Sequence, residues 1–292
     1  MERAEVTIIG LGGLGSTLAK ALSAHDIPVK SVFNRSIGKA KKLADQLGIS
    51  VADDFPGELS QLGDIVFITV SDQAIAQVAD RLAALSNNFE GKLCAHCSGN
   101  ATADLLNPLQ KKGAATASFH PLQTFTPQSG PEFFNGIYFS LQGDEQAFTK
   151  LQDIAKRLEA ETFEITSEQK SHLHAAAVLA SNYLNTLLDT AVEVGSLSGL
   201  PRSQVQKALL PLIKTSLKNR EDRSFADTLT GPIKRGDVQT VKTHVTLLKD
   251  QPGLYRLYCV LGNRTIELAE SSGSLDQATA DKLRHILEGA DG

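Results

Sequence analysis

The residues that most directly indicate chemistry stand near the start of the chain, in the run Val6-Thr7-Ile8-Ile9-Gly10-Leu11-Gly12-Gly13-Leu14-Gly15. An apolar, β-branched segment leads into the pattern G-x-G-x-x-G, and helix-forming residues follow it. The first glycine permits a tight turn, the second lets a pyrophosphate approach the backbone, and the third lets the helix pack on the strand. The start of that helix also offers free N–H groups and the positive end of its dipole. The stretch therefore predicts dinucleotide binding by Gly10, Leu11, Gly12, Gly13, Leu14 and Gly15. The alternative is a glycine turn in an α/β domain that has lost its cofactor.

The end of the second predicted strand, residues 28–33, indicates which dinucleotide binds. NAD-specific sites carry an acidic residue about 20 positions past the glycines. Here the strand ends in Asn34-Arg35-Ser36, with no carboxylate. Arg35 can make a bidentate contact to a 2′-phosphate, and Ser36 can donate a further hydrogen bond. We therefore predict NADP(H) rather than NAD(H), with Asn34, Arg35 and Ser36 at the cofactor; the alternative is that Arg35 belongs to a solvated helix start.

Two further strand ends are expected to line the cofactor cleft, since ligands of parallel sheets bind beyond the carboxyl ends of the strands. The run 64–70 is the clearest buried strand, and it leads through Val70 and Ser71 into a helix that Asp72 is expected to cap. The strand at 92–97 leads into Ser98. We assign Val70, Ser71 and Ser98 to the cofactor site.

A histidine follows the next predicted strand, residues 114–119. His120 stands at the carboxyl end of that strand and is followed by Pro121, which places it well for the cleft. It is a candidate catalytic residue, and the alternative is a structural histidine bonded to a loop carbonyl. Two last strands are expected at 136–141 and 162–165.

The three cysteines do not predict a metal or disulfide site. Cys94 and Cys97 form C-x-x-C, but residues three apart on a strand point to opposite faces, and Cys259 stands alone. We therefore assign no metal ligands and interpret the thiols as small buried apolar groups.

The second part of the chain is predicted to be all helical. A long stretch from Ser167 to about Leu197 is apolar nearly all round, so we expect it to be the buried central helix of this domain. Further helices are expected at 202–219, 224–229, 237–249, 254–268 and 275–287, with Asp237 as a cap. The domains are accordingly predicted at 1–165 and 166–292.

Polar residues on the long helix are the remaining candidates. At about 100° per residue, His174, Ser181 and Asn185 fall within about 20° of one line along the helix. Lys170 lies one turn before His174, and Asn182 lies about 80° around the helix axis from that line. A polar stripe on a buried helix faces a cleft, a partner or a satisfied network. We assign His174, Asn182 and Lys170, with His120, as candidate catalytic residues.

Composition excludes several classes of protein. The 292 residues include 41% hydrophobic and 21% charged residues, and the net charge of -4 favours neither nucleic acid nor an anionic membrane as a partner. No apolar run approaches the roughly 20 residues of a membrane span. The first residues lead directly into a strand without a signal peptide, from which we expect a cytoplasmic protein.

These motifs resemble those of the 6-phosphogluconate-dehydrogenase-like superfamily, which includes pyrroline-5-carboxylate reductases and F420-dependent NADP reductases. More closely, the chain is similar to the family that joins a Rossmann-like domain to a C-terminal domain of unknown function (the DUF2520 type). The resemblance is carried by the glycine pattern and by five further runs: Asn34-Arg35-Ser36, Ser118-Phe119-His120-Pro121-Leu122-Gln123, His174-Ala175-Ala176-Ala177, Ser181-Asn182-Tyr183, and residues 229–237 (LTGPIKRGD).

The resemblance implies a doubly wound, mostly parallel Rossmann sheet followed by an all-α domain of the 6-phosphogluconate-dehydrogenase type, and homodimers built through the helical domain. Related dehydrogenases carry Lys and then Asn four positions on in the long helix, whereas here Lys170 is followed by His174. The combined prediction is an NADP(H)-dependent oxidoreductase that acts on a small carbonyl, imine or hydroxy compound in the interdomain cleft. The alternative is a non-catalytic NADP(H)-binding sensor or scaffold.

Overall fold

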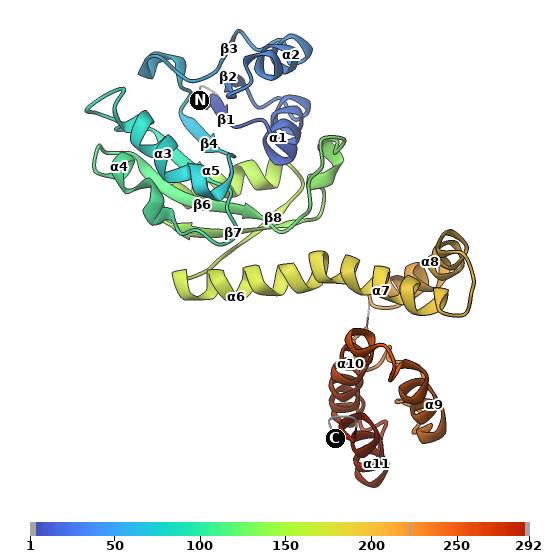
Figure 1. Ribbon diagram of the computed structural model, residues 1–292. Helices are drawn as coiled ribbons and strands as arrows, with labels where there is room; N and C mark the ends of the chain where they lie inside the picture. Colours follow the sequence, from blue (N-terminus) through green and yellow to red (C-terminus); the bar gives the residue numbers. More distant parts are fainter. Residues whose placement is uncertain (1–3, 222, 290–292) are drawn as a thin grey trace. The chain divides into compact units, whose positions relative to one another are not determined.

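The computed structural model (Figure 1) describes residues 4–221 and 223–289. The chain divides into two compact units between Asn182 and Tyr183. The domain boundary predicted at residue 165 lies at the end of the last strand, before the long helical stretch that runs across the division. Each unit is described by itself below.

The first unit is built on one eight-stranded sheet with the strand order β3-β2-β1-β4-β5-β6-β7-β8. β7 runs antiparallel to β6, and the other neighbours are parallel. Order and direction confirm the predicted mostly parallel, doubly wound fold. The strands are β1 (Val6–Ile9), β2 (Val29–Phe33), β3 (Val51–Asp53), β4 (Ile65–Ile68), β5 (Leu93–His96), β6 (Ala115–Pro121), β7 (Tyr138–Gly143) and β8 (Glu161–Glu164).

Helices cover both faces of the sheet. One core cluster joins β1, β6 and β7 to α1 (Gly13–Ala24), α2 (Ile37–Leu47) and α5 (Glu145–Arg157). The other joins β4 and β5 to α3 (Asp72–Ala83) and α4 (Asn107–Gln110). α5 buries Ala147, Leu151 and Ile154, the spacing of one helical face. Short 3₁₀ turns complete the unit: η1 (Leu59–Gln61), η2 (Ala103–Leu106) and η3 (Pro131–Phe134).

Two expectations about local structure have clear outcomes in this unit. Cys94 and Cys97 are both buried and lie in opposite core clusters, as the alternation of side chains along a strand requires. The expected cap at Asp72 is wrong by one position, because Ser71 is the N-cap residue of α3 and Asp72 begins the helix.

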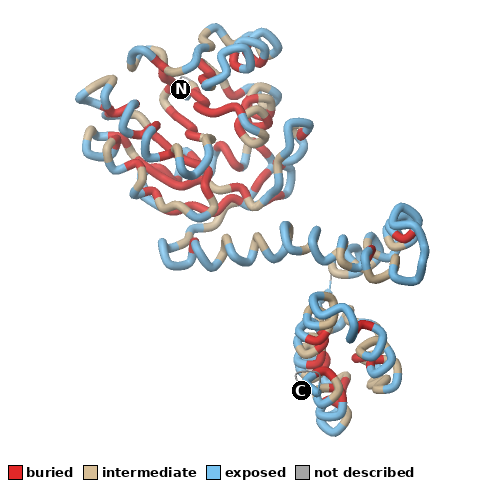
Figure 2. The backbone as a smooth tube through the Cα atoms, viewed as in Figure 1, coloured by how far each residue is buried: buried red, intermediate tan, exposed pale blue. Residues whose placement is uncertain are grey.

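The long helical stretch forms as predicted but is not buried. It consists of α6 (Ser167–Val178), a π-helical turn (Leu179–Tyr183) and α7 (Leu184–Ser196). A capping box between Thr166 and Gln169 starts it. α6 buries only Lys170 and α7 only Val192, so most of the stretch is pale blue or tan in Figure 2. The predicted buried central helix is therefore wrong for the single chain.

The second unit continues with α8 (Arg202–Lys218), which packs on α7, and with a bundle of α9 (Val238–Leu248), α10 (Pro252–Ser271) and α11 (Gln277–Glu288). Val241, Ile266 and Leu283 are fully buried between these three helices. Asp237 caps α9 as predicted, by accepting a hydrogen bond from the backbone of Thr240. The helix expected at 224–229 is wrong, since those residues form turns.

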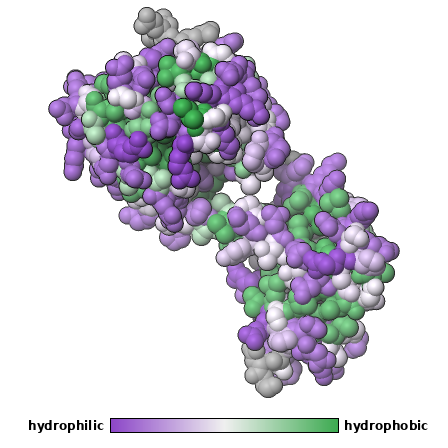
Figure 3. Space-filling model, turned by 45° about the horizontal axis from the view of Figure 1, so that its top comes forward, coloured by the Kyte–Doolittle hydropathy of each residue, from purple (hydrophilic) through white to green (hydrophobic). Residues whose placement is uncertain are grey.

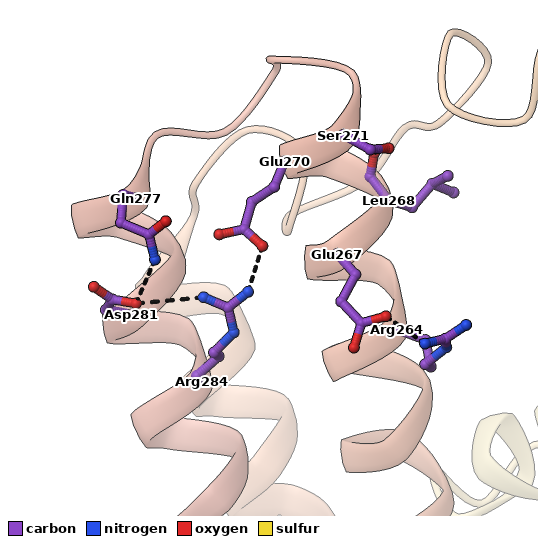
Figure 4. Close-up of polar contacts among 8 residues, drawn as sticks. All are labelled: Arg264, Glu267, Leu268, Glu270, Ser271, Gln277, Asp281 and Arg284. Carbon is purple, nitrogen blue, oxygen red and sulfur yellow. Dashed lines mark hydrogen bonds and ion pairs between the residues drawn. The ribbon is translucent and has the colours of Figure 1, made fainter.

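Charged side chains also join α10 to α11. Arg284 of α11 pairs with Glu270 of α10, and its second amino group lies 3.3 Å from Asp281 (Figure 4). Gln277 donates to the same Asp281 carboxylate at 2.8 Å. Partly exposed pairs of this kind add little stability, so the apolar contacts between the three helices hold the bundle together.

Candidate functional site

The glycine turn after β1 leaves one approach to its backbone open. Gly10 has φ +103°, and a Cβ there would lie 2.8 Å from Val70. A Cβ on Gly15 would overlap the carbonyl oxygen of Gly10. These two glycines are therefore required by the fold. Gly12 is different, because it is exposed and nothing lies within 4 Å of the place of its missing Cβ. The turn thus fits a pyrophosphate approaching Gly12 at the start of α1.

Asn34 holds this turn in place. Its side-chain oxygen accepts a hydrogen bond from the backbone N–H of Leu11 at 3.0 Å, and its side-chain nitrogen donates to the carbonyl oxygen of Ser36 at 3.1 Å. The side chain thereby joins the glycine turn to the end of β2. Asn34, predicted at the cofactor site, is thus placed beside the turn with both of its polar groups engaged by backbone.

Arg35 and Ser36 follow Asn34 and are exposed. Ser36 is the N-cap residue of α2, yet its side chain accepts no capping hydrogen bond. A guanidinium and a hydroxyl, two groups that can bind a phosphate, thus follow Asn34 in exposed positions at the end of β2.

The other predicted cofactor residues lie at the carboxyl ends of β4 and β5. Val70 is half-buried against Gly10, and Ser71 is exposed at the start of α3. Ser98 is buried, and its hydroxyl accepts hydrogen bonds from the backbone N–H groups of Asn100 and Ala101 at 3.2 and 3.0 Å. The side chain of Ser98 therefore shapes the turn after β5.

Lys170 joins α6 to the sheet at this edge. Its ammonium group is buried and donates to the carbonyl oxygen of Ser98 at 2.8 Å and to the hydroxyl of Ser118 at 2.6 Å. Burial lowers the pKa of Lys170 from 10.5 to about 8. The candidate catalytic lysine thus fixes the start of α6 against the turn after β5 and against the middle of β6.

His120 and His174 come together beside this lysine. His120 lies within β6, which extends two residues further than predicted, and it alternates with Phe119 of the core. His174 lies one turn after Lys170 on α6, and the two imidazole rings are 6.4 Å apart between centroids in a T-shaped arrangement. Burial, followed by the charges of Lys170 and His174, lowers the pKa of His120 to about 4. His120 is therefore neutral at neutral pH.

A cavity of about 660 Å³ adjoins both histidines. Its lining includes Leu122 and Phe125 from the segment after β6, and Ser181 and Asn182 from the π-helical turn. A π-helical turn rotates less per residue than an α-helix, so Asn182 comes round toward the face of His174. Three of the four candidate catalytic residues, His120, His174 and Asn182, thus line one cavity. Lys170 is not among the lining residues, and its ammonium group bonds Ser98 and Ser118 instead.

Two features of the site were not predicted from the sequence. Gly99 lies directly against both imidazoles, because a Cβ there would stand 2.6 Å from Nδ1 of His174 and 2.8 Å from Nε2 of His120. The segment after β6 also covers the glycine turn, since a Cβ on Gly13 would lie 2.7 Å from the carbonyl oxygen of Phe125. In both cases a glycine lies in close contact with residues far away in the sequence, and no local sequence pattern indicates such a contact.

His96 was also not singled out, and it is a structural residue. It is fully buried at the end of β5, where Nε2 lies 2.9 Å from the carbonyl oxygen of Thr102 and Nδ1 accepts from the backbone N–H of Ser98. Burial lowers its pKa to about 4. Both ring nitrogens are engaged, so His96 supports the Ser98 turn and offers nothing to a ligand.

Two protein-family models match the chain. Residues 1–121 match a Rossmann-like domain, and residues 137–265 match the Domain of unknown function (DUF2520). No curated protein sequence matches the chain significantly. Among the described residues, helices are too short or too polar to cross a membrane.

Solved structures share this architecture over nearly the whole chain. A protein from Thermotoga maritima is 28% identical with a TM-score of 0.74, over 92% of this chain and 99% of that one. A candidate NADP oxidoreductase from Bacteroides fragilis is 26% identical with a TM-score of 0.69, over 91% and 99%. The pyrroline carboxylate reductase of Plasmodium falciparum, solved with NADP bound, is 17% identical with a TM-score of 0.58, over 98% and 99%, and shares the fold.

Proposed function

The chain joins a Rossmann-like domain to a DUF2520 domain, and we propose that it is an NADP(H)-dependent oxidoreductase that transfers a hydride to or from a small carbonyl, imine or hydroxy compound. The observation that carries this proposal is the position of the His120–His174 cavity at the sheet edge where the glycine turn leaves Gly12 open. The similarity to the candidate NADP oxidoreductase from Bacteroides fragilis supports the same function.

NADP(H) is the proposed cofactor because of the chemistry at the end of β2. Arg35 and Ser36 are exposed there, and residues 34–39 include Lys39 but no carboxylate. A carboxylate at this position would favour the free ribose hydroxyls of NAD(H), whereas a guanidinium favours a 2′-phosphate. The backbone of the glycine turn and the N-terminus of α1 would hold the pyrophosphate.

The residues of the cavity have separable tasks in this reaction. When bound, the cofactor supplies or accepts the hydride. His120 or His174 exchanges a proton with the substrate oxygen or nitrogen, and Asn182 orients that atom through its amide. Lys170 is a positioning residue, since its ammonium group is engaged by Ser98 and Ser118.

A substrate screen that follows NADPH absorbance tests the function. Small ketones, aldehydes and cyclic imines are offered with NADPH, and the corresponding alcohols and amines with NADP⁺. We expect turnover with at least one compound, and His120→Asn and His174→Asn should lower kcat by about 10²–10⁴-fold while NADPH affinity is retained. Tight NADPH binding with no turnover across the screen would instead support a sensor or scaffold.

We also propose that the protein is a homodimer through its helical part. Large apolar side chains are exposed along the π-helical turn, α7 and α8, among them Leu179 at 62%, Tyr183 at 60% and Leu212 at 63%, and hydrophobic patches of the helical part are visible in the lower half of Figure 3. Exposed apolar surface of this extent is typical of an interface. Light scattering should give twice the mass of the chain at micromolar concentration, and a monomer would contradict the proposal.

The cytoplasmic location and the binding of substrate between the domains stay predictions.

A further inference from the structure

The cavity that adjoins the two histidines has largely apolar walls. The segment after β6 contributes Leu122 and Phe125, and α6 contributes Leu173 and Ala177. The ring of Phe125 packs on the buried ring of Phe134, with 4.9 Å between their centroids, so this wall is anchored on the core. The volume of about 660 Å³ is typical of cavities that hold small molecules. A ligand that fills this cavity therefore contacts mainly apolar side chains.

The walls of the cavity carry no fixed charge. Among the described residues that line it, none has an ammonium, guanidinium or carboxylate group. His120 is neutral at neutral pH, because burial lowers its pKa to about 4. The positive charge of Lys170 is buried and directed to Ser98 and Ser118. A carboxylate or phosphate would thus leave water without a cation on these walls to pair with it, which is costly.

The polar side chains on the walls are neutral, and some of them are engaged within the protein. Gln123 accepts a hydrogen bond from the backbone N–H of Thr124 at 2.8 Å. The hydroxyl of Ser181 donates to the carbonyl oxygen of Ala177 and to the side-chain oxygen of Asn182, both at 2.9 Å. Neutral groups of this kind suit the single oxygen or nitrogen of a carbonyl or imine, whereas carboxylates and phosphates are generally bound by Arg or Lys.

Given the oxidoreductase function proposed above, we propose that the substrate is an uncharged ketone, aldehyde or imine whose apolar ring or chain is seated against Phe125 and Ala177. Keto acids, amino-acid imines and phosphate esters fall outside this class. Ala177 lies three residues after His174, on the same side of α6, and both line the cavity. The small side chain at position 177 therefore leaves the room next to the imidazole that the apolar part of the substrate fills.

Pairs of substrates that differ only in charge test this class by kinetics. Each ketone and cyclic imine of the NADPH screen is offered beside an analogue that carries one carboxylate, such as cyclohexanone and its analogue with a carboxylate on the ring carbon opposite the carbonyl. The uncharged member should have the higher kcat/KM, by at least about tenfold. A higher kcat/KM for the carboxylate would overturn the substrate class while leaving the oxidoreductase function in place.

A larger side chain at position 177 tests where the apolar part lies. Ala177→Leu should lower kcat/KM for the uncharged substrate by at least about tenfold, because it fills the cavity, and should leave NADPH affinity unchanged. Ala175→Leu is the matched control, since Ala175 is exposed on the same helix and is not among the lining residues. The control should keep the kcat/KM of the wild type. Equal kcat/KM in the two variants would contradict the assigned position.

Saturation-transfer NMR tests the cavity without turnover, with cyclohexanone and its carboxylated analogue as the probes. Cyclohexanone should bind the wild type and Ala175→Leu, and Ala177→Leu should lose this signal. Selective binding of cyclohexanone by a protein that reduces no compound of the screen would refute the oxidoreductase function and keep the apolar ligand class. Binding of the carboxylated analogue as tightly as cyclohexanone, or binding of neither, would overturn that class.

Discussion

Lys170 donates a 2.6 Å hydrogen bond to the hydroxyl of Ser118, and this contact joins the long helix to the strand that carries His120. Ser118 and His120 alternate with Phe119, so they lie on the same face of β6. The lysine also holds the carbonyl oxygen of Ser98, next to Gly99. The ammonium group of Lys170 thus ties together α6, β6 and the turn at Ser98, the three segments next to His120 and His174.

The pH dependence of stability should report this buried cation. The pKa of Lys170 is about 8 in the folded protein against 10.5 ordinarily, so the unfolded chain binds more protons between these values and stability rises with pH across that window. The wild type should therefore gain free energy of unfolding from pH 8 to pH 10 relative to Lys170→Met, by up to about 3 kcal/mol. Urea unfolding at several pH values measures this, and parallel curves for the two proteins would contradict it.

Two histidines that are neutral in the folded protein, the buried His96 and the half-buried His120, should make it sensitive to acid. The pKa values of His96 and His120 are both about 4 in the folded state, below the ordinary 6.5. The unfolded chain therefore binds more protons in this window, and stability falls as pH drops from 6.5 to 4. Thermal unfolding should show Tm falling over that range, and less steeply in His120→Asn. Identical slopes in the two proteins would rule out a lowered pKa of His120 in the folded state.

Gly99→Ala should separate the two imidazoles without changing either one. The added methyl group would stand less than 3 Å from both rings, and these side chains must move to admit it. A displacement of about 1 Å at a catalytic group can cost about 10²-fold in rate. Steady-state kinetics should show a lower kcat with circular dichroism unchanged. Full activity in Gly99→Ala would show that the spacing of the rings is unimportant.

Gly12 and Gly13 offer a matched pair of substitutions. An alanine at Gly12 meets no atom within 4 Å, whereas an alanine at Gly13 meets the backbone of Phe125. Gly12→Ala should leave Tm unchanged and weaken NADPH binding, because its methyl group occupies the open approach to the turn. Gly13→Ala should lower Tm. Thermal unfolding and fluorescence titration with NADPH distinguish the two, and equal Tm losses would contradict this difference between the glycines.

The sequence predicted the parts of the structure that depend on local pattern. The run Val6–Gly15 and the strand-end residues Arg35 and Val70 could be placed because a parallel sheet brings the carboxyl ends of its strands to one edge. The positions of Lys170 and His174 one turn apart followed from helical periodicity.

Features that depend on tertiary contact could not be predicted in this way. The π-helical turn that brings Asn182 to the cavity has no sequence signal of its own. The approach of Gly99 to the histidines and of Gly13 to Phe125 joins distant parts of the chain. The long helix was expected to be buried because its residues are apolar. Apolar composition, however, does not show whether other helices of the same chain or a partner molecule bury its surface.

The central claim, that the glycine turn and Arg35 bind NADP(H), is tested most directly by calorimetric titration of the wild type and Arg35→Ala with NADPH and NADH. NADPH should bind the wild type at least about tenfold more tightly than NADH, and Arg35→Ala should weaken NADPH binding by about 1–3 kcal/mol while leaving NADH nearly unaffected. Equal affinity of the wild type for both nucleotides, or binding of neither, would contradict the account.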